Sequence, residues 1–136
     1  MDYRKLMLIA NQVRQNAYAP YSGFSVGCAL LTASGKVYTG VNIENVSFSA
    51  GCCAERVALY KAVSEGERDF VALAVCGGKV NEIDPVCSPC GVCRQTLSEF
   101  CKSDFIILLG TPDNFRPYTL LDLLPFNFNA DLKVGK

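Results

Sequence analysis

The stretch FVALAVC at residues 70–76 is a continuous apolar run, and a second such run, FIILL, follows at residues 105–109. Strands that are buried on both faces of a sheet have this composition, whereas half-exposed strands alternate apolar and polar residues. Helix-like segments precede and separate the two runs, at residues 54–65 and 91–100. This order predicts an α/β protein whose central sheet carries helices on both faces.

The segments before residue 54 extend this pattern. Apolar residues at steps of three and four predict an amphipathic helix over residues 2–17, which ends near Pro20. Residues 26–33 and 37–43 predict two antiparallel strands joined by a turn at Ser34-Gly35, so we expect the sheet to be mixed.

Two local predictions complete the chain. Gly77-Gly78 is expected to open a loop after the first apolar run, and residues 119–124 are expected to form a last short helix. The sequence shows no internal repeat, low-complexity tract or linker, and 136 residues suit one hydrophobic core. We therefore expect a single domain over residues 1–136.

The composition argues against several classes of function. Thirteen basic residues balance thirteen acidic ones, which is unlike proteins that bind nucleic acid or anionic membranes through bulk charge. Histidine is absent, so the chain has no Ser-His or Cys-His nucleophile and no imidazole metal ligand. A general base must be a carboxylate, a lysine, a tyrosine or a thiolate.

Eight cysteines are the other unusual feature of the composition. In a secreted protein they would suggest disulfides. Residues 1–10 (MDYRKLMLIA) lack the pattern of a signal peptide, and no apolar run approaches the ~20 residues that cross a bilayer. We therefore expect a cytoplasmic protein with no membrane partner, in which cysteines are more often buried apolar residues, metal ligands or catalysts.

Two cysteine motifs stand at expected helix starts. Cys53 precedes the helix at residues 54–65, and Cys90 and Cys93 form a Cys-x-x-Cys pair at the start of the next helix. Helix N-termini favour thiolates, and three thiolates would leave the fourth tetrahedral position of Zn²⁺ open for water, as in catalytic sites. Buried thiols or a redox pair are the alternatives for a Cys-x-x-Cys motif alone.

Glu55 follows Cys53 by two residues and is the candidate general base. Residues two apart do not share a face of a regular helix, so Glu55 reaches the metal site only if Cys53 lies at the very start of the helix. Otherwise Glu55 is a first-turn acid that complements the helix dipole. Three thiolates around Zn²⁺ leave a net negative charge, which Arg56 could offset by hydrogen bonding to the sulfurs; a solvated helix arginine is the alternative.

The other five cysteines receive no role from the sequence. Cys28 and Cys76 lie in apolar strands, and Cys52 cannot easily point at the metal beside its neighbour. Cys87 extends the pair to C-x₂-C-x₂-C, but the x₃-C-P continuation of ferredoxin-type iron–sulfur runs does not follow, because the next cysteine is Cys101.

Three further positions suit substrate binding. Asn42 and Glu44 occupy alternate positions at the end of a strand, so an amide and a carboxylate could together bind a sugar hydroxyl; polar loop residues are the alternative. The backbone N–H of Ala54, at a helix start, is free to donate to a substrate carbonyl oxygen.

These motifs together resemble a known family. Cys53-Ala54-Glu55 with Pro89-Cys90-x-x-Cys93 resembles the signature of zinc-dependent nucleoside deaminases. Some of these deaminases use a histidine ligand where this sequence has a cysteine; in this respect the sequence resembles the short, homotetrameric cytidine deaminases. The resemblance runs nearly end to end, through Tyr18-Ala19-Pro20-Tyr21-Ser22-x-Phe24, Asn42-Ile43-Glu44-Asn45 and Leu123-Leu124-Pro125.

The resemblance implies a three-layer cytidine-deaminase-like fold, one Zn²⁺ per subunit, and hydrolytic deamination of cytidine and deoxycytidine in pyrimidine salvage. It assigns Asn42 and Glu44 to the ribose and Phe24 to stacking on the pyrimidine. It also implies a homotetramer whose sites are closed by neighbouring subunits, with Phe48 and Phe128 as candidate contributors. The tail FNFN at residues 126–129 differs from the small residues expected there.

Three other functions compete with this interpretation. One is a deaminase of another aminopyrimidine nucleoside such as blasticidin S, against which Phe24 and the Asn42-x-Glu44 motif argue. Another is a noncatalytic zinc module closed by Cys87 or Cys52, in which Glu55 would have no purpose. A nucleic-acid deaminase would need a basic channel, which the balanced charge disfavours.

Overall fold

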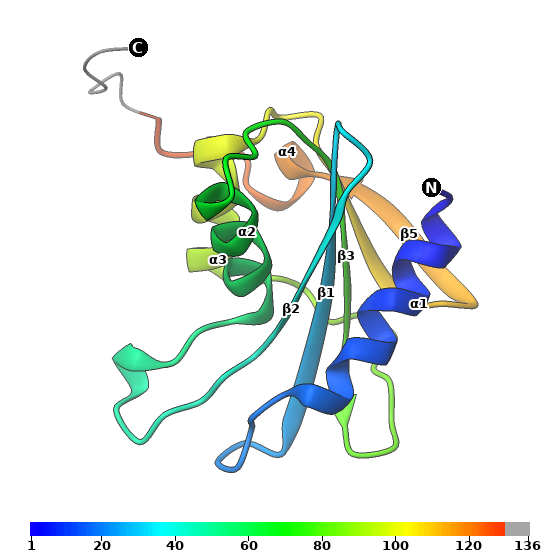
Figure 1. The fold of residues 1–136 in the computed structure, drawn as a ribbon, viewed down its shortest axis with the longest axis vertical. Coiled ribbons are helices and arrows are strands. Elements are labelled where there is room, and N and C mark those ends of the chain that lie inside the picture. Colours follow the sequence, from blue (N-terminus) through cyan, green and yellow to red (C-terminus); the bar gives the residue numbers. More distant parts are fainter. Residues whose placement is uncertain (130–136) are drawn as a thin grey trace.

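Residues 1–129, which the computed structural model describes, contain five strands in one sheet of order β2-β1-β3-β4-β5 (Figure 1). In this described sheet the β3–β4 pair is parallel and the other three pairs are antiparallel, so the expected mixed sheet is confirmed. The strands are β1 (Phe24–Thr32), β2 (Val37–Val41), β3 (Phe70–Lys79), β4 (Ile106–Thr111) and β5 (Asn114–Thr119).

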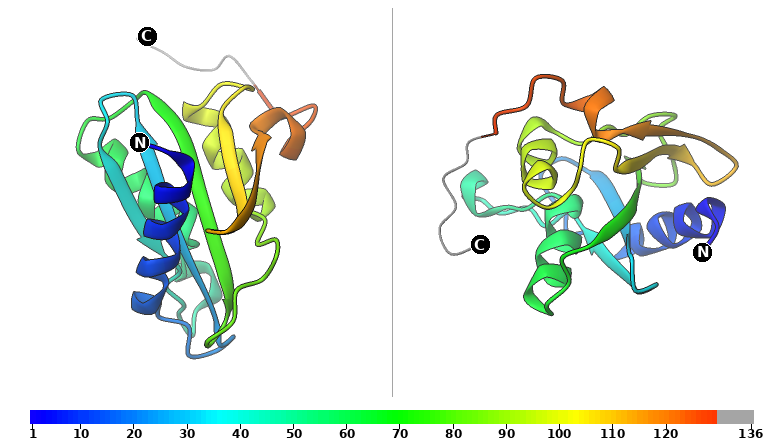
Figure 2. Two further views of the ribbon diagram at one scale, coloured as in Figure 1. Left: turned by 90° about the vertical axis from the view of Figure 1, so that its right-hand side faces the viewer. Right: turned by 90° about the horizontal axis from the view of Figure 1, so that it is seen from above.

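Helices cover both faces of this sheet, as the sequence predicts. Figure 2 shows α1 on one side and α2 and α3 on the other. Two short 3₁₀ turns, at Arg14–Asn16 and Phe48–Ala50, accompany the helices. The helices are α1 (Tyr3–Val13), α2 (Ala54–Ser64), α3 (Gly91–Phe100) and α4 (Leu120–Leu123).

The apolar run of β3 divides between two cores. Ala72 and Ala74 pack with Leu6 of α1 in one cluster, whereas Leu73 and Val75 pack in the cluster formed with α2 and α3. Alternate residues of a strand point to opposite faces, so a strand between two layers of helices must be apolar at every position. This is the physical reason for the FVALAVC sequence.

The loop predicted at Gly77-Gly78 is wrong, because both glycines lie inside β3 and pair with β1. Their lack of side chains serves close packing of the segment that follows the strand. A Cβ on Gly77 would lie 2.4 Å from Cys87 Sγ, and one on Gly78 would lie 2.3 Å from the Glu82 carbonyl oxygen. The glycines therefore let the segment after β3 fold back against the strand.

The start of α2 lies directly against the sheet at Gly40 of β2. A Cβ on Gly40 would lie 2.3 Å from the Ala54 carbonyl oxygen and 2.6 Å from the Ala58 backbone nitrogen. The missing side chain therefore brings the first turn of α2 down onto β2. This contact fixes the height of that turn above the strands.

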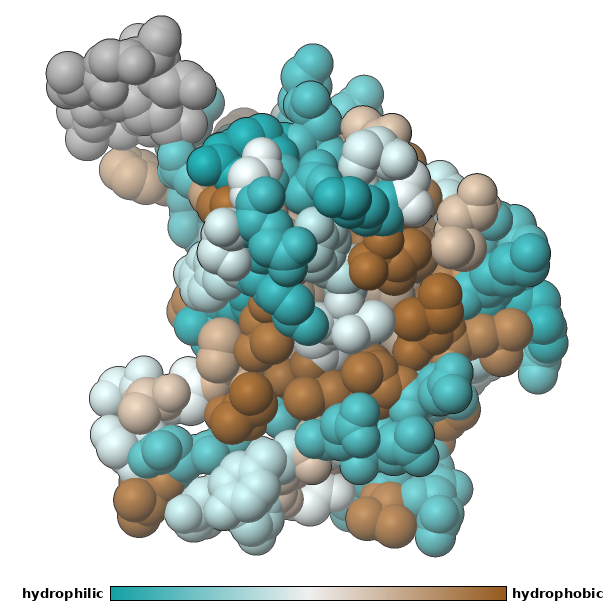
Figure 3. Space-filling view, viewed as in Figure 1, coloured by the Kyte–Doolittle hydropathy of each residue, from teal (hydrophilic) through white to brown (hydrophobic). Residues whose placement is uncertain are grey.

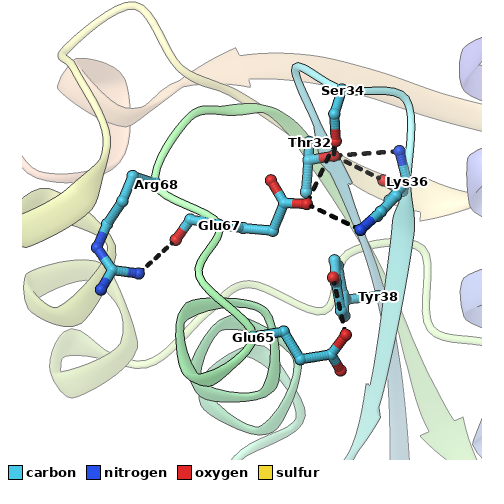
Figure 4. A network of polar contacts seen from close by, with 7 residues as sticks. All are labelled: Thr32, Ser34, Lys36, Tyr38, Glu65, Glu67 and Arg68. Atoms are coloured by element: carbon cyan, nitrogen blue, oxygen red, sulfur yellow. Dashed lines mark hydrogen bonds and ion pairs between the residues drawn. The ribbon is translucent and has the colours of Figure 1, made fainter.

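The C-terminal end of α2 is held to the β1–β2 turn by polar contacts (Figure 4). The Tyr38 hydroxyl donates to Glu65 Oε1 over 3.2 Å, and Lys36 Nζ lies 3.6 Å from Glu67 Oε1. Ser34 Oγ also donates to Glu67 Oε1, over 3.3 Å. Together with the Gly40 contact, these bonds attach α2 to the hairpin near both of its ends.

Apolar surface forms a band across the middle of the face in Figure 3, with polar surface above and below it. Strongly exposed apolar side chains in the described residues include Val46, Phe48 and Phe126. None of the helices in residues 1–129 has the length and apolar character that crossing a bilayer requires.

Candidate metal centre and adjoining pocket

Cys53, Cys90 and Cys93 come together where the starts of α2 and α3 meet. Cys53 is the N-cap residue of α2, Cys90 is the N-cap residue of α3, and Cys93 lies in the first turn of α3. Their Sγ atoms all lie within 4.8 Å of one another. The Cys53–Cys90 distance is 3.8 Å and the Cys90–Cys93 distance is 3.5 Å. Three sulfurs so placed fit a tetrahedral Zn²⁺ with one position left for water.

Arg56 lies beside this cluster, with Nη2 3.5 Å from Cys53 Sγ. Hydrogen bonds from Cys93 and from Arg56 lower the pKa of Cys53 to about 5, which favours the thiolate form of this sulfur. The bond to Cys53 and burial raise the pKa of Cys93. Among the described residues, Arg56 Nε is buried and has no hydrogen-bond partner. The guanidinium contacts the sulfur cluster through Nη2, where its positive charge can offset the negative charge of thiolate ligands.

Glu55 is buried behind the cluster, with 5% of its surface exposed. Because Cys53 caps the helix, the chain is still turning there, and Glu55 points to the same interior as the sulfurs. Cys28 Sγ donates to Glu55 Oε1 over 3.6 Å. Burial raises the pKa of Glu55. A carboxyl group whose pKa moves toward neutrality can both accept and release a proton.

A pocket of about 490 Å³ opens beside Cys53 and Arg56 and is also lined by Asn42, Glu44 and Phe48. It therefore joins the cluster of sulfurs to the end of β2 and to the loop that follows it. Its volume and its mixed polar and apolar lining suit a small organic molecule.

Glu44 is held in a fixed orientation at the rim of this pocket. Its Oε1 accepts hydrogen bonds from the backbone N–H groups of Tyr21 and Ser22, over 3.0 and 3.1 Å, and its Oε2 accepts from the Ser22 hydroxyl. The Ser22 side chain contributes most to lowering the pKa of Glu44. Glu44 therefore presents a preorganised anionic acceptor.

Asn42 is bound to the backbone of β1 through both ends of its amide. Its Oδ1 accepts from the Val26 N–H over 2.8 Å, and its Nδ2 donates to the Phe24 carbonyl oxygen over 2.8 Å. The same amide lines the pocket, so one acceptor position of Oδ1 and one N–H remain for a ligand.

Phe24 and Ala54 are both absent from the described residues that line the pocket. Phe24 begins β1, and a Cβ on Gly77 would lie 3.0 Å from its Cε1 atom. The ring therefore packs over β3 and is not among the described residues that line the pocket. Ala54 is the first residue of α2, so its N–H has no carbonyl partner within the helix.

The two aromatic residues expected to close a neighbouring site differ in position. Phe48 is 87% exposed and lines the pocket. Phe128 is 75% exposed, and its carbonyl oxygen accepts a hydrogen bond from Gln95 Nε2 over 3.2 Å. Phe128 thus lies beside α3, outside the lining of the pocket.

The contact between Cys28 and Glu55 is a feature that the sequence does not reveal. Cys28 is expected to be a core residue, and it is fully buried, but its thiol also faces the carboxylate. A second pocket, of about 580 Å³, surrounds Arg14 on the α1 side of the sheet. The Arg14 guanidinium donates to the carbonyl oxygens of Ser25 and Glu82, so it ties the start of β1 to the segment that follows β3.

Comparisons with known proteins agree with this geometry. A family model described as "Cytidine and deoxycytidylate deaminase zinc-binding region" matches residues 1–109. A cytidine deaminase of Halalkalibacterium halodurans is 45% identical over 132 residues, covering 96% of this chain and 97% of that protein. One of Sporosarcina psychrophila is 43% identical over 132 residues, covering 96% and 94%. A crystal structure of cytidine deaminase from Burkholderia pseudomallei superimposes with a TM-score of 0.86 at 41% identity, covering 94% and 100%.

Proposed function

Because the chain belongs to the zinc-binding family of cytidine and deoxycytidylate deaminases, we propose that its three-cysteine cluster is the centre of a cytidine deaminase. The activity is the hydrolytic deamination of cytidine to uridine and ammonia, and we extend it to deoxycytidine. The observation that carries the proposal is the convergence of Cys53, Cys90 and Cys93 beside a buried carboxylate, Glu55.

The three cysteines would hold Zn²⁺ as thiolates, and Arg56 would offset part of their charge through its contact with Cys53. When bound, Zn²⁺ supplies a water molecule of lowered pKa at the open end of the cluster. A fourth protein ligand would close this position, and Cys52 and Cys87 do not belong to the group of described residues that could hold the ion. This supports a catalytic centre over a purely structural one.

Glu55 carries the proton in this proposal. It accepts a proton from the attacking water and delivers it to the ring nitrogen of the pyrimidine. It then accepts the second proton, from the hydroxyl that has been added to the ring, and delivers it to the amino group, which leaves as ammonia. Its burial supports this role, because a raised pKa reduces the cost of holding the proton between the two transfers. In a chain without histidine, no imidazole competes for the task.

The adjoining pocket would bind the nucleoside. The Ala54 N–H, at the start of α2, is free to donate to the pyrimidine carbonyl oxygen. Asn42 and Glu44 would bind ribose hydroxyls, and the fixed orientation of Glu44 supports selection of a hydroxyl-bearing substrate. We also assign Phe24 to stacking on the base, although its ring lies over β3 and outside the lining of this pocket.

We further propose a cytoplasmic homotetramer that acts in pyrimidine salvage. The exposed Phe48 beside the pocket and the apolar band in Figure 3 support association, because an open site must exclude water during the reaction. The eight cysteines, which all lie in the described residues, form no disulfide; this is the state expected in a reducing compartment, and it leaves the sulfurs available as thiolate ligands.

The test combines metal analysis with an ammonia-release assay on the purified protein. We expect one zinc per chain, turnover of cytidine and deoxycytidine, and little activity on blasticidin S or a single-stranded DNA oligonucleotide. The matched variant Glu55→Gln keeps the shape of the side chain and should retain zinc while losing activity by about 10²-fold or more. Zinc-loaded protein that is inert toward cytidine would overturn the proposal.

A further inference from the structure

The buried thiol of Cys28 faces the carboxylate that the proposed reaction uses. Cys28 lies in the middle of β1, where its backbone pairs with Gly40 of β2 on one side and Val75 of β3 on the other. Its Sγ lies 3.6 Å from Glu55 Oε1, and its exposed surface is 0%. Two strand partners fix the backbone, so the thiol is held at a constant position in the sheet.

The neighbour of Cys28 in β2 explains why a helix carboxylate can reach a strand thiol. Gly40 stands opposite Cys28, and the Ala54 carbonyl oxygen lies over it at a distance that leaves no room for a Cβ. The first turn of α2 therefore descends onto β2, and Glu55, in that turn, reaches β1. The contact between Cys28 and Glu55 depends on this close approach.

Cys28 donates to Glu55 from outside the cluster of candidate metal ligands. The Sγ atom of Cys28 donates to Glu55 Oε1 over 3.6 Å, whereas Cys93 belongs to the group of residues that could hold the metal. Cys28 keeps its proton, because burial and the negative charge of Glu55 raise its pKa far above the usual range.

We propose that Cys28 is a positioning residue, whose S–H···O bond fixes the Glu55 carboxylate so that Oε2 is left for water and substrate. This inference rests on the proposed function and deepens it. A thiol is a weak donor, so it orients the carboxylate while stabilising the anion less than a hydroxyl would.

Steady-state kinetics of three zinc-loaded variants test the proposal. Cys28→Ala should lower kcat about tenfold, with KM within about twofold of the wild type, because orientation in the transition state is lost while ground-state binding is not. Cys28→Ser keeps a donor and should recover most of kcat.

Cys76→Ala is the matched control for the loss of a buried thiol. Cys76 lies in β3, is also 0% exposed, and donates to the Met7 carbonyl oxygen on the opposite face of the sheet. Its removal should lower the melting temperature about as much as Cys28→Ala does and leave kcat unchanged. An unchanged kcat in Cys28→Ala, or an equal loss in Cys76→Ala, would overturn the positioning role.

An infrared measurement tests the contact itself and does not depend on turnover. The S–H stretching band of Cys28 is identified by its disappearance in Cys28→Ala, and it should move to higher frequency in zinc-loaded Glu55→Ala, where the acceptor is missing. A band that does not move would overturn the proposal. Wild-type protein inactive toward cytidine would overturn the proposed function instead, whatever the position of the band.

Discussion

The Sγ atoms of Cys53 and Cys90 lie 3.8 Å apart although the two residues are 37 positions apart in the sequence. Each belongs to the N-cap residue of a helix, so the positive ends of α2 and α3 point at one place. A single helix start already favours a thiolate, and two that converge favour a cluster of thiolates. The parallel β3–β4 arrangement brings these helix starts together, so the metal centre depends on the whole sheet.

Cys53→Ser should abolish stoichiometric zinc binding, because it removes the one ligand that α2 supplies. Inductively coupled plasma mass spectrometry of the purified variant should show zinc well below one per chain. The control is Cys52→Ser, which changes the adjacent cysteine outside the cluster and should keep zinc at the wild-type level. Equal zinc loss in both variants would mean that Cys52 shares in binding.

Arg56→Ala should lower cytidine turnover by about tenfold in protein that still contains zinc, because the charge of three thiolates is no longer offset. Turnover and zinc content should be measured on the same preparation. Arg68→Ala is the control, since Arg68 donates to the Val63 and Glu67 carbonyl oxygens at the other end of α2. Unchanged turnover in Arg56→Ala would show that its contact with Cys53 has no catalytic consequence.

The parts of the fold that could be predicted are those whose pattern is set by local burial. The run in β3 is apolar throughout because helices cover both faces, and α3 begins and ends where the sequence predicts. Strand β5 was not predicted; it contains Pro117, which is tolerated because β5 lies at the edge of the sheet. The loop prediction at Gly77 was wrong because this glycine lies inside a strand, where its missing side chain permits close packing.

The same distinction applies to the site. The relation of Cys53 to Glu55 depends on one local condition, an N-cap at Cys53, and could be stated from the sequence. The contact of Cys28 with Glu55 depends on the register of β1 against β2 and on the height of α2 above them. No short-range pattern encodes these distances, so a buried cysteine in an apolar strand looks like packing alone.

Gly40→Ala should destabilise the protein by about 1–3 kcal/mol, because the new Cβ meets the Ala54 carbonyl oxygen and α2 must move outward. Urea unfolding of the zinc-loaded protein measures this loss. Gly91→Ala is the control, since a Cβ at this first position of α3 meets no atom within 4 Å. Equal stability of the two variants would contradict the close approach of α2 to β2.

Glu44→Gln should reduce kcat/KM for cytidine by about tenfold to a hundredfold, because a charged acceptor of a sugar hydroxyl is replaced by a neutral one. Competitive inhibition by free cytosine, which lacks the sugar, should change by less than about twofold. The two constants are compared in one assay. Equal losses for the nucleoside and the base would remove Glu44 from the ribose site.

Phe48→Ala should lower kcat/KM for cytidine by about threefold to tenfold if the exposed ring covers a site in the assembly. Native mass spectrometry should give four times the chain mass of 14.8 kDa for the wild type. A monomer with full activity would contradict the shared site.

Coexpression then shows whose site Phe48 serves. A tetramer that mixes Phe48→Ala chains with Glu55→Gln chains combines an intact Glu55 from one chain with an intact Phe48 from the other. If Phe48 acts on a neighbour, kcat/KM per intact Glu55 should rise above that of the Phe48→Ala homotetramer. If it acts within its own chain, every site that retains Glu55 also lacks the ring, and no recovery occurs. Mixing Glu55→Gln with Cys53→Ser, whose changes both lie at the metal centre, provides the baseline without recovery.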